Sequence, residues 1–304
     1  MRAVFCSLAV PAMLLVAACR GEHEARTSAA APIVLVDDHG DTVRLATPAT
    51  RVVSLIPSAT ETLIALGAAD RIVGRTRYDL DPAVASKPTV GAGIGPNLEA
   101  IIALRPDLVI LWSDTKRGDT QSQLTRAGVR TLAVSLQDTT DAFRALTLIS
   151  TAVGERARGA ALADSLRRTF AAIKASVAGQ RAPRVFYVVF NNPPMTTGPG
   201  TFIAQILSLA GGDNIFADAI TNWPTIPIEE LVRRDPDVIV LPVGEMQTSP
   251  ATRLQALPGW RDLRAVREGH VVTIDADLAS RPGPNMGRAA VTLCNLLHPS
   301  RATP

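Results

Sequence analysis

Residues 98–110 read LEAIIALRPDLVI, and residues 228–240, which begin 130 positions later, read IEELVRRDPDVIV. Each stretch has an acidic residue second, then apolar residues at helical spacing, then Pro-Asp, and finally a continuous apolar run. This order is typical of a short amphipathic helix that leads into a buried strand of a parallel sheet. Two further pairs are collinear with it: RVVSLI (51–56) with RVFYVV (184–189), and LGAADRI (66–72) with LAGGDNI (209–215). The chain therefore contains an internal repeat of a strand–helix–strand unit.

Each copy of the repeat predicts one Rossmann-like α/β lobe with a parallel sheet, the first over residues 51–138 and the second over 181–304. Residues 139–180 contain no proline, and most of their apolar residues recur every three or four positions. This spacing predicts one long amphipathic α-helix that joins the lobes, with Gly154 as the point where it could break. We expect a ligand cleft between the lobes, because clefts at domain junctions commonly bind small molecules.

Local signals define the predicted elements of the first lobe. Ser58 and Glu61 have the spacing of a capping box, which predicts a helix that begins there and ends at Gly67. Asn97 is predicted to cap the next helix. Strands are predicted over residues 51–56, 71–74, 108–111 and 129–136.

The first residues of the chain predict an export signal rather than part of the fold. A positive start at Arg2 precedes an apolar run that ends in VAAC at residues 16–19, which is similar to a bacterial lipobox. That likeness implies a signal peptide over residues 1–18 and acylation of Cys19, which would anchor the protein to a membrane in the periplasm or cell envelope. The alternative is an ordinary secretory signal that is cleaved near Ala18. Residues 19–50 are predicted to be a tether and a lead-in to the first lobe.

The composition argues against several classes of function. The formal net charge of the 304 residues is +3, without long runs of like charge, so nucleic acid is not expected as a partner. The sequence contains no G-x-S-x-G, P-loop, H-E-x-x-H or C-x-x-C motif, and its four histidines are scattered. We therefore expect neither an enzyme nor a bound metal or cofactor. An active site that Asp, Ser and His form only in three dimensions stays open as an alternative.

Aromatic residues make up only 4% of the chain, and some of them fall in loops after predicted strands. Tyr78 follows the strand predicted at 71–74, Trp223 lies in TNWP (221–224), and NNPPM (191–195) follows the strand that begins at residue 184. Loops at the carboxyl ends of parallel strands are where such lobes bind ligands, so a shared apolar cleft is favoured. Trp223 taken alone could instead fold back as a plug on its own lobe. Trp112 and Trp260 are predicted to be packing residues.

From about residue 51 to residue 295, the chain resembles the periplasmic substrate-binding proteins of ABC importers that have a long connecting helix. This class serves corrinoids, haem and ferric siderophores, and it shares the Glu and Pro-Asp of the repeated stretch at 98–110 and 228–240. Asn-Pro-Pro at 192–194, Trp-Pro at 223–224 and D-x-x-x-R at 277–281 are more particular to its cobalamin-binding branch. The resemblance implies a monomeric lipoprotein that captures cobalamin or a related corrinoid and delivers it to a transmembrane permease. A ferric siderophore or haem remains the alternative ligand.

Matched position by position, the resemblance implies that Tyr78, Met195 and Trp223 line the cleft. It also implies that Asp277 and Arg281 contact the amide groups at the periphery of the corrin, where a carboxylate accepts and a guanidinium donates hydrogen bonds. Ser58, in the first helix, would add backbone donors to the ligand site.

Two positions depart from the pattern of the cobalamin-binding branch. Met195 and Gly93 stand where that branch has aromatic residues, so affinity or ligand choice is expected to differ. The branch also forms a disulfide at the position of Cys294, whose partner position holds Ala210 here. Cys294 is therefore expected to be a lone thiol in the folded part of the chain.

The repeat places Glu99 and Glu229 at equivalent positions, one in each lobe. The resemblance implies that these glutamates dock onto arginines of the transmembrane permease subunits. The alternative is that each is a first-turn acid that stabilises the N-terminus of its helix, an effect of about 0.3–1 kcal/mol.

Overall fold

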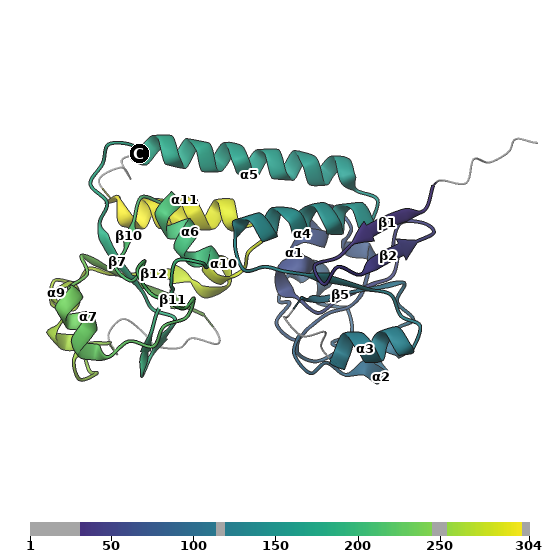
Figure 1. Cartoon of the computed structure of the whole chain (residues 1–304), viewed down its shortest axis with the longest axis horizontal. Helices are drawn as coiled ribbons and strands as arrows, with labels where there is room; N and C mark the ends of the chain where they lie inside the picture. Colours follow the sequence, from purple (N-terminus) through teal and green to yellow (C-terminus); the bar gives the residue numbers. More distant parts are fainter. Residues whose placement is uncertain (1–30, 114–118, 245–253, 300–304) are drawn as a thin grey trace, which may run out of the picture. The chain divides into compact units, whose positions relative to one another are not determined.

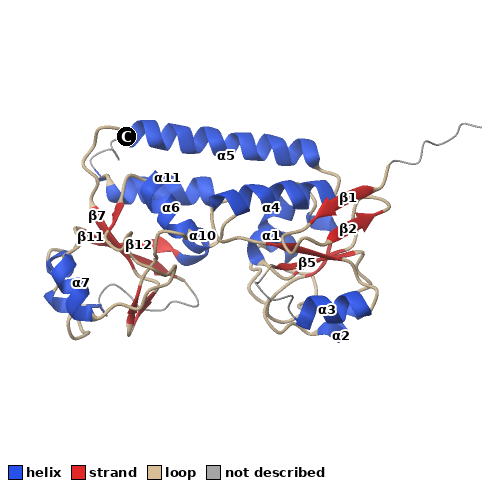
Figure 2. Ribbon diagram, viewed as in Figure 1, coloured by secondary structure: helices blue, strands red, loops and turns tan. Residues whose placement is uncertain are grey.

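The computed structural model describes residues 31–113, 119–244 and 254–299 (Figure 1). The compact unit Pro32–Pro304 contains two four-stranded sheets, and the strands that pair within each of them run parallel. Helices pack against both sheets, which confirms the predicted α/β class with two similar lobes (Figure 2).

The sheet of the N-terminal lobe has the strand order β4-β3-β5-β6. Its strands are β3 (Val52–Ser54), β4 (Ile72–Gly74), β5 (Leu108–Trp112) and β6 (Thr131–Val134). The helices of this lobe are α1 (Pro57–Ala65), α2 (Leu98–Ala103) and α3 (Asp119–Arg126), with short 3-10 helices η1 (Ala69–Arg71) and η2 (Pro82–Val84). The first four residues of β5 and all four of β6 are buried, as expected for strands covered on both faces.

The sheet of the C-terminal lobe has the order β10-β7-β11-β12. Its strands are β7 (Arg184–Tyr187), β10 (Asp213–Asn214), β11 (Val238–Val243) and β12 (Val271–Asp275). A small antiparallel hairpin of β8 (Phe190–Asn191) and β9 (Pro194–Met195) follows β7. The helices of the lobe are α6 (Phe202–Leu209), α7 (Ile228–Arg234), α9 (Arg264–Arg267), α10 (Ala276–Ser280), α11 (Met286–Leu297) and the 3-10 helix η3 (Trp260–Asp262).

The internal repeat is confirmed by the sheets and by the role of the Pro-Asp motif. Strands β4, β3, β5 and β6 occupy the same order as β10, β7, β11 and β12. Asp107 accepts a hydrogen bond from the backbone N–H of Arg51 at 3.0 Å, and Asp237 accepts one from that of Arg184 at 3.0 Å. We call these two contacts the amino-end clamps, because each ties the start of a central strand to the start of its neighbour.

The two clamp arginines repeat each other as well. Each donates from Nη2 at 2.6 Å to a carbonyl at the end of a helix, that of Leu104 in the first lobe and that of Arg234 in the second. The next residues, Arg105 and Asp235, have φ values of 45° and 42°, in the left-handed region that a non-glycine residue seldom adopts. The helix therefore ends in the same way in both copies before the chain enters the strand.

The segment predicted to join the lobes forms two helices rather than one unbroken helix, and the break falls at the glycine that the prediction marked as a possible break point. Helix α4 (Thr139–Ala152) packs against α1, and α5 (Arg156–Val177) runs beside α4 and reaches α6 and α11 of the second lobe (Figure 1). Gly154 separates them with a φ of 73°, a left-handed conformation that glycine adopts freely. Helix α5 alone extends for about 33 Å, given a rise of about 1.5 Å per residue.

The predicted capping box at Ser58 and Glu61 is wrong. Helix α1 begins at Pro57, whose ring fixes a helical φ at the first position, and Ser58 is buried inside the first turn. The structure shows no side-chain cap on this helix. Asn97, by contrast, caps α2 as predicted, because its Oδ1 accepts a hydrogen bond from the N–H of Ala100 at 3.0 Å.

A β-hairpin precedes the first lobe, within the range predicted as tether and lead-in. It consists of β1 (Ile33–Val36) and β2 (Thr42–Leu45), which pair antiparallel. Asp37, in its turn, accepts a hydrogen bond through Oδ2 from the N–H of Ala133 in β6 at 3.1 Å. The hairpin is thus attached to the sheet of the N-terminal lobe.

The largest buried cluster runs through both lobes, and it includes Val52, Leu166 of α5 and Val185. Cys294 is the one cysteine among the described residues, and it is buried without a disulfide, as expected. No helix in the described part of the chain is both long enough and apolar enough to cross a membrane.

Candidate ligand site

The predicted ligand residues lie in segments that follow the carboxyl ends of strands. Tyr78 follows β4, Met195 lies in the hairpin after β7, and Asp277 lies two residues beyond the end of β12. Because the strands of each sheet are parallel, such segments gather at one edge of that sheet, where α/β proteins bind ligands.

At this edge the N-terminal lobe has a pocket of about 1040 Å³. Ile94, Leu111 and Trp112 supply its apolar wall. Ile94 is 88% exposed and Trp112, the last residue of β5, is 37% exposed, so Trp112 is less buried than its prediction as a packing residue implied. The apolar run of β5 suggested burial, but its final residue passes beyond the edge of the sheet. That position was the available signal, because a ring at the carboxyl end of a central strand faces the ligand edge.

The polar side of the same pocket is held together by contacts within the protein. Arg144 pairs with the buried carboxylate of Asp38 at 2.8 Å, and His39 Nδ1 lies 2.6 Å from Gln121 Oε1. Ile94 and Trp112 are the exposed apolar side chains of the pocket wall, and Asp119, Gln137 and Arg144 are exposed polar ones.

Gly93 lies beside Trp112 and leaves no room for a side chain. A Cβ atom at Gly93 would lie 2.3 Å from the carbonyl oxygen of Leu55 and 3.9 Å from Trp112 Nε1. The aromatic side chain that the resemblance places at this position does not fit this backbone. Trp112 supplies a ring next to the position instead.

Gly93→Ala is expected to lower the free energy of unfolding by about 2 kcal/mol, because its methyl group would collide with a backbone oxygen that has little freedom to move. Urea denaturation measures the change. Gly244→Ala is the matched control, since the Cβ there would lie 3.3 Å from the Cβ and 4.0 Å from the N of Ala276, and a change below about 1 kcal/mol is expected. Equal stability of Gly93→Ala and the wild type would contradict the steric argument.

Arg281 connects the two lobes. Its Nη1 lies 2.8 Å from Glu61 Oε1 in α1, and its Nη2 donates to the carbonyl of Tyr78 at 3.1 Å and pairs with Asp277 at 2.8 Å. Asn285 donates to the other oxygen of Glu61 at 2.9 Å. The structure thus brings Tyr78, Asp277 and Arg281 together, but the guanidinium is engaged by protein groups. Glu61, which sequence reasoning assigned to a helix cap, is its partner.

Two members of the predicted set differ in exposure. Asp277 keeps half of its side chain exposed, so one edge of its carboxylate is open to a ligand. Ser58 is buried, and its Cβ lies 3.2 Å from where a Cβ of Gly283 would be, so it packs at the junction of the lobes. Its role as a source of backbone donors stays a prediction.

In the C-terminal lobe, residues 194–198 pair antiparallel with residues 222–226. The N–H of Ile226 donates to the carbonyl of Pro194 at 2.7 Å, Met195 bridges Thr225, and the N–H of Gly198 donates to the carbonyl of Asn222 at 2.8 Å. This pairing brings the segments of Met195 and Trp223 side by side.

The tryptophans of this lobe differ in environment. Trp223 is 46% exposed, so nearly half of its surface is open at the surface of the lobe. Trp260 is buried, and its Nε1 donates to the carbonyl of Asn191 at 3.1 Å, which confirms it as a packing residue.

The two predicted docking glutamates are equivalent in the structure. Glu99 and Glu229 lie exposed in the first turns of α2 and α7. Both helices lie on the side of their sheets away from α4 and α5 (Figure 1). In the part of the chain that the structure describes, neither carboxylate has an ion pair. Ile102 and Val232, three residues later in each helix, are also exposed.

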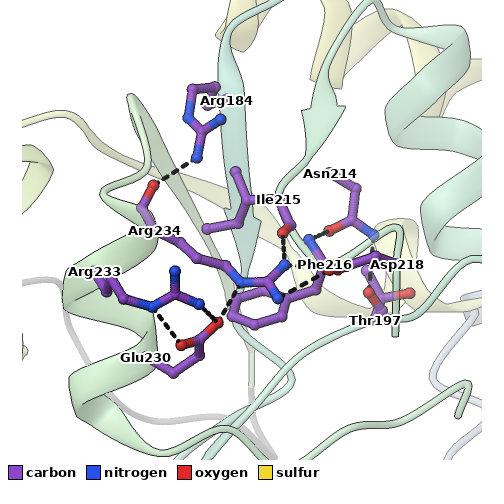
Figure 3. A network of polar contacts seen from close by, with 9 residues as sticks. All are labelled: Arg184, Thr197, Asn214, Ile215, Phe216, Asp218, Glu230, Arg233 and Arg234. Atoms are coloured by element: carbon purple, nitrogen blue, oxygen red, sulfur yellow. Dashed lines mark hydrogen bonds and ion pairs between the residues drawn. The ribbon is translucent and has the colours of Figure 1, made fainter. Parts of the chain in front are cut away.

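Glu230, the neighbour of Glu229, forms hydrogen bonds with arginines of its own lobe (Figure 3). Arg234 donates from Nε to Glu230 at 2.7 Å and from Nη1 to Asp218 at 2.6 Å. Hydrogen bonds from Arg233 and Arg234 hold the pKa of Glu230 below its usual range, and Arg234 does the same for Asp218. The arginines of α7 are therefore occupied by these acids, and Glu229 remains available to a partner.

Cys19 and the predicted signal peptide lie outside the described residues.

The comparisons with known proteins agree with this architecture. Residues 52–278 match the periplasmic binding protein family. The chain is 34% identical over 255 residues to the vitamin B12-binding protein of Salmonella paratyphi A, which covers 82% of this chain and 90% of that protein. It is 29% identical over 275 residues to an uncharacterized ABC transporter substrate-binding lipoprotein of Bacillus subtilis, with 88% and 86% covered.

Two solved structures have the same fold. The periplasmic vitamin B12 binding protein of Vibrio cholerae is 26% identical with a TM-score of 0.70, and the match covers 84% of this chain and 99% of that one. A periplasmic heme binding protein from Pseudomonas aeruginosa is 26% identical with a TM-score of 0.73, and the match covers 83% and 94%. The resemblance read from the sequence is thus confirmed, and the chain belongs to the periplasmic binding protein family.

Proposed function

We propose that this protein is the substrate-binding component of an ABC importer, that it captures cobalamin or a related corrinoid between its lobes, and that it delivers the ligand to a transmembrane permease. The 34% identity to a vitamin B12-binding protein supports the ligand class. The named relatives are binding and transport proteins rather than enzymes, which supports a role without catalysis.

The observation that carries the proposal is the exposure of large apolar side chains at the ligand edges of both lobes. Ile94 and Trp112 are exposed on the N-terminal lobe and Trp223 on the C-terminal lobe, in a chain with only three Trp and two Tyr. Exposed apolar patches that face a junction mark binding surfaces, and rings offer flat contact to a macrocycle. The half-exposed carboxylate of Asp277 would accept hydrogen bonds from amide N–H groups of a corrin.

The same proposal includes a location and a partner surface. Cys19 would be the acylated N-terminus of the mature protein, which would work as a monomer held at a membrane on the periplasmic side. A relative at 29% identity is itself named a lipoprotein, and mass spectrometry of the mature N-terminus tests the acylation. Glu99 and Glu229 would contact basic residues of the two permease subunits.

Isothermal titration calorimetry of the purified protein with cyanocobalamin tests the ligand. One ligand per chain is expected, with a Kd of about 1 μM or tighter, equivalent to about 8 kcal/mol of binding free energy. Absence of binding at micromolar cyanocobalamin, together with binding of haem or a ferric siderophore, would overturn the corrinoid assignment.

Haem is the second candidate, because a heme binding protein of known structure is as similar in sequence as the corrinoid-binding one, at 26% identity. Tyr78 is the tyrosine of the ligand edge, and a phenolate can serve as an axial ligand of haem iron. A Soret band that is lost in Tyr78→Phe would favour haem over the corrinoid.

A further inference from the structure

Phe190 is directly opposite Met195 in the hairpin of β8 and β9. Residues that face each other across an antiparallel pair lie on the same face, with Cβ atoms about 4.5–5.5 Å apart. Met195 bridges Thr225 on its other side, two residues after Trp223. Phe190, Met195 and the segment of Trp223 therefore lie side by side across three paired segments.

The opposite face of this small sheet is turned toward the interior of the lobe. Pro194, the neighbour of Met195, is buried, and its cross-strand partner is Asn191. Both border the same pocket as Ile226 and Trp260, which are buried. Side chains alternate between the two faces of a strand, so Phe190 and Met195 point away from this core.

The exposure of Phe190 agrees with that orientation. It is 56% exposed, and of the six phenylalanines in the described residues it is the one with more than half of its surface accessible. The exposed ring of Phe190, the partly buried Met195 and the half-exposed Trp223 thus form one apolar surface of the lobe. We call Phe190, Met195 and Trp223 the aromatic face.

We propose that Phe190 is a specificity-determining residue of the ligand site, which supplies the aromatic contact absent at Met195. This inference rests on the proposed function, because it takes a flat corrinoid as the ligand of the aromatic face. The ring lies on the adjacent strand, displaced by about 4.8 Å from the position of Met195. Met195, with three rotatable bonds, adapts its shape to the ligand beside a rigid ring.

The position of the Phe190 ring explains how the cleft keeps an aromatic surface although Met195 and Gly93 are not aromatic. The C-terminal lobe then presents Phe190 and Trp223, and the N-terminal lobe presents Trp112 beside Gly93. Moving the ring by one strand shifts the area that contacts the ligand toward β8. A ligand substituent that lies beside Met195 therefore has more room than it would have if an aromatic ring stood at position 195.

Calorimetry with cyanocobalamin on Phe190→Ala tests the role of the ring. A loss of affinity of about tenfold is expected, the size typical of an aromatic anchor in a binding surface. Thermal unfolding should stay close to that of the wild type, because the removed ring is mostly exposed. Ile220→Ala is the matched control, since Ile220 is fully exposed and precedes the paired segment 222–226, and an unchanged affinity is expected.

A second variant tests whether binding needs a ring on this face or a ring at position 190 in particular. The exchange Phe190→Met with Met195→Phe keeps one ring and one methionine on the same face, because the two positions are directly opposite. Affinity within about threefold of the wild type is expected, well above that of Phe190→Ala.

The outcomes distinguish the two proposals. If the wild type does not bind cyanocobalamin, the proposed function fails. If the wild type binds and Phe190→Ala binds equally well, or Ile220→Ala loses as much affinity as Phe190→Ala, the role of Phe190 is overturned while the function stands.

Discussion

Replacement of Glu99 and Glu229 together by alanine is expected to lower the ligand-dependent stimulation of the importer's ATPase at least about tenfold, while the affinity for cyanocobalamin stays within about twofold. The reason is that both carboxylates are exposed at equivalent places in α2 and α7 and form no ion pair within the described residues. A charge that becomes desolvated against a partner's cation contributes strongly to an interface, about 2 kcal/mol or more when one side is truncated. The measurement is ATP hydrolysis by the reconstituted importer.

The surface around each glutamate supports a specific contact. Ile102 and Val232 lie three residues after the glutamates, on the same side of each short helix, and both are exposed. Each lobe therefore offers one acid and one aliphatic side chain in the same arrangement. A partner with two equivalent basic and apolar sites, as a permease built of two similar subunits would present, matches this arrangement.

Two controls make the docking experiment decisive. Glu99→Gln with Glu229→Gln keeps the size of the side chains and removes only the charge, so it should reproduce the loss. Asp164→Ala removes an exposed acid on α5 and should leave stimulation unchanged. If the double alanine variant stimulates normally and only loses about 0.3–1 kcal/mol of stability per site, the glutamates merely stabilise their helices.

Arg281→Ala is expected to lower the free energy of unfolding by about 3 kcal/mol, because it leaves Glu61 without its cation between the lobes. The side chains of Arg281 and Glu61 are only 18% and 17% exposed, so water compensates poorly for the lost contacts. For a chain of this size the melting temperature should fall by about 6–12 °C, which thermal unfolding followed by circular dichroism measures.

An exposed ion pair provides the comparison for this variant. Arg167 pairs with Asp164 at 3.0 Å, but both side chains are about 60% exposed, so Arg167→Ala should cost less than about 1 kcal/mol. A double-mutant cycle of Arg281→Ala and Glu61→Gln should show a coupling of about 1 kcal/mol or more. If Arg281→Ala melts like the wild type and loses only ligand affinity, Arg281 acts as a ligand donor and not as a tie between the lobes.

The repeat could be predicted because the residues that define it make contacts with neighbouring strands and helices of the same lobe. Pro-Asp at 106–107 and 236–237 contacts the backbone of the adjacent strand, and any working copy of the unit needs this contact. The hairpin at 33–45 was missed although its four-residue strands flank a turn that contains Gly40 at a φ of 82°. Its strands were too short to stand out beside the tether that precedes them.

The site was harder to predict because its key contacts join distant positions. Arg281 and Glu61 are 220 residues apart in the sequence. The Ser-x-x-Glu pattern suggested a helix cap for Glu61 instead, but the helix begins at Pro57 and has no such cap. Trp112 is apolar like the buried residues that precede it in β5. It is exposed because it lies at the end of the strand, at the edge of the sheet. Phe190 could be recognised as a site residue only from the register of the hairpin, which places it opposite Met195. The sequence NNPPM does not specify that register.

The amino-end clamps lie at the opposite end of the strands from the ligand edge. Along β5 that separation is about 16 Å for five residues, beyond the distance at which substitutions usually influence each other's energies. Changes at positions such as Met195 or Trp223 therefore leave the contacts of Asp107 and Asp237 untouched. The fold can thus tolerate turnover in its binding residues, so members of one family can diverge in cargo while they keep the same architecture.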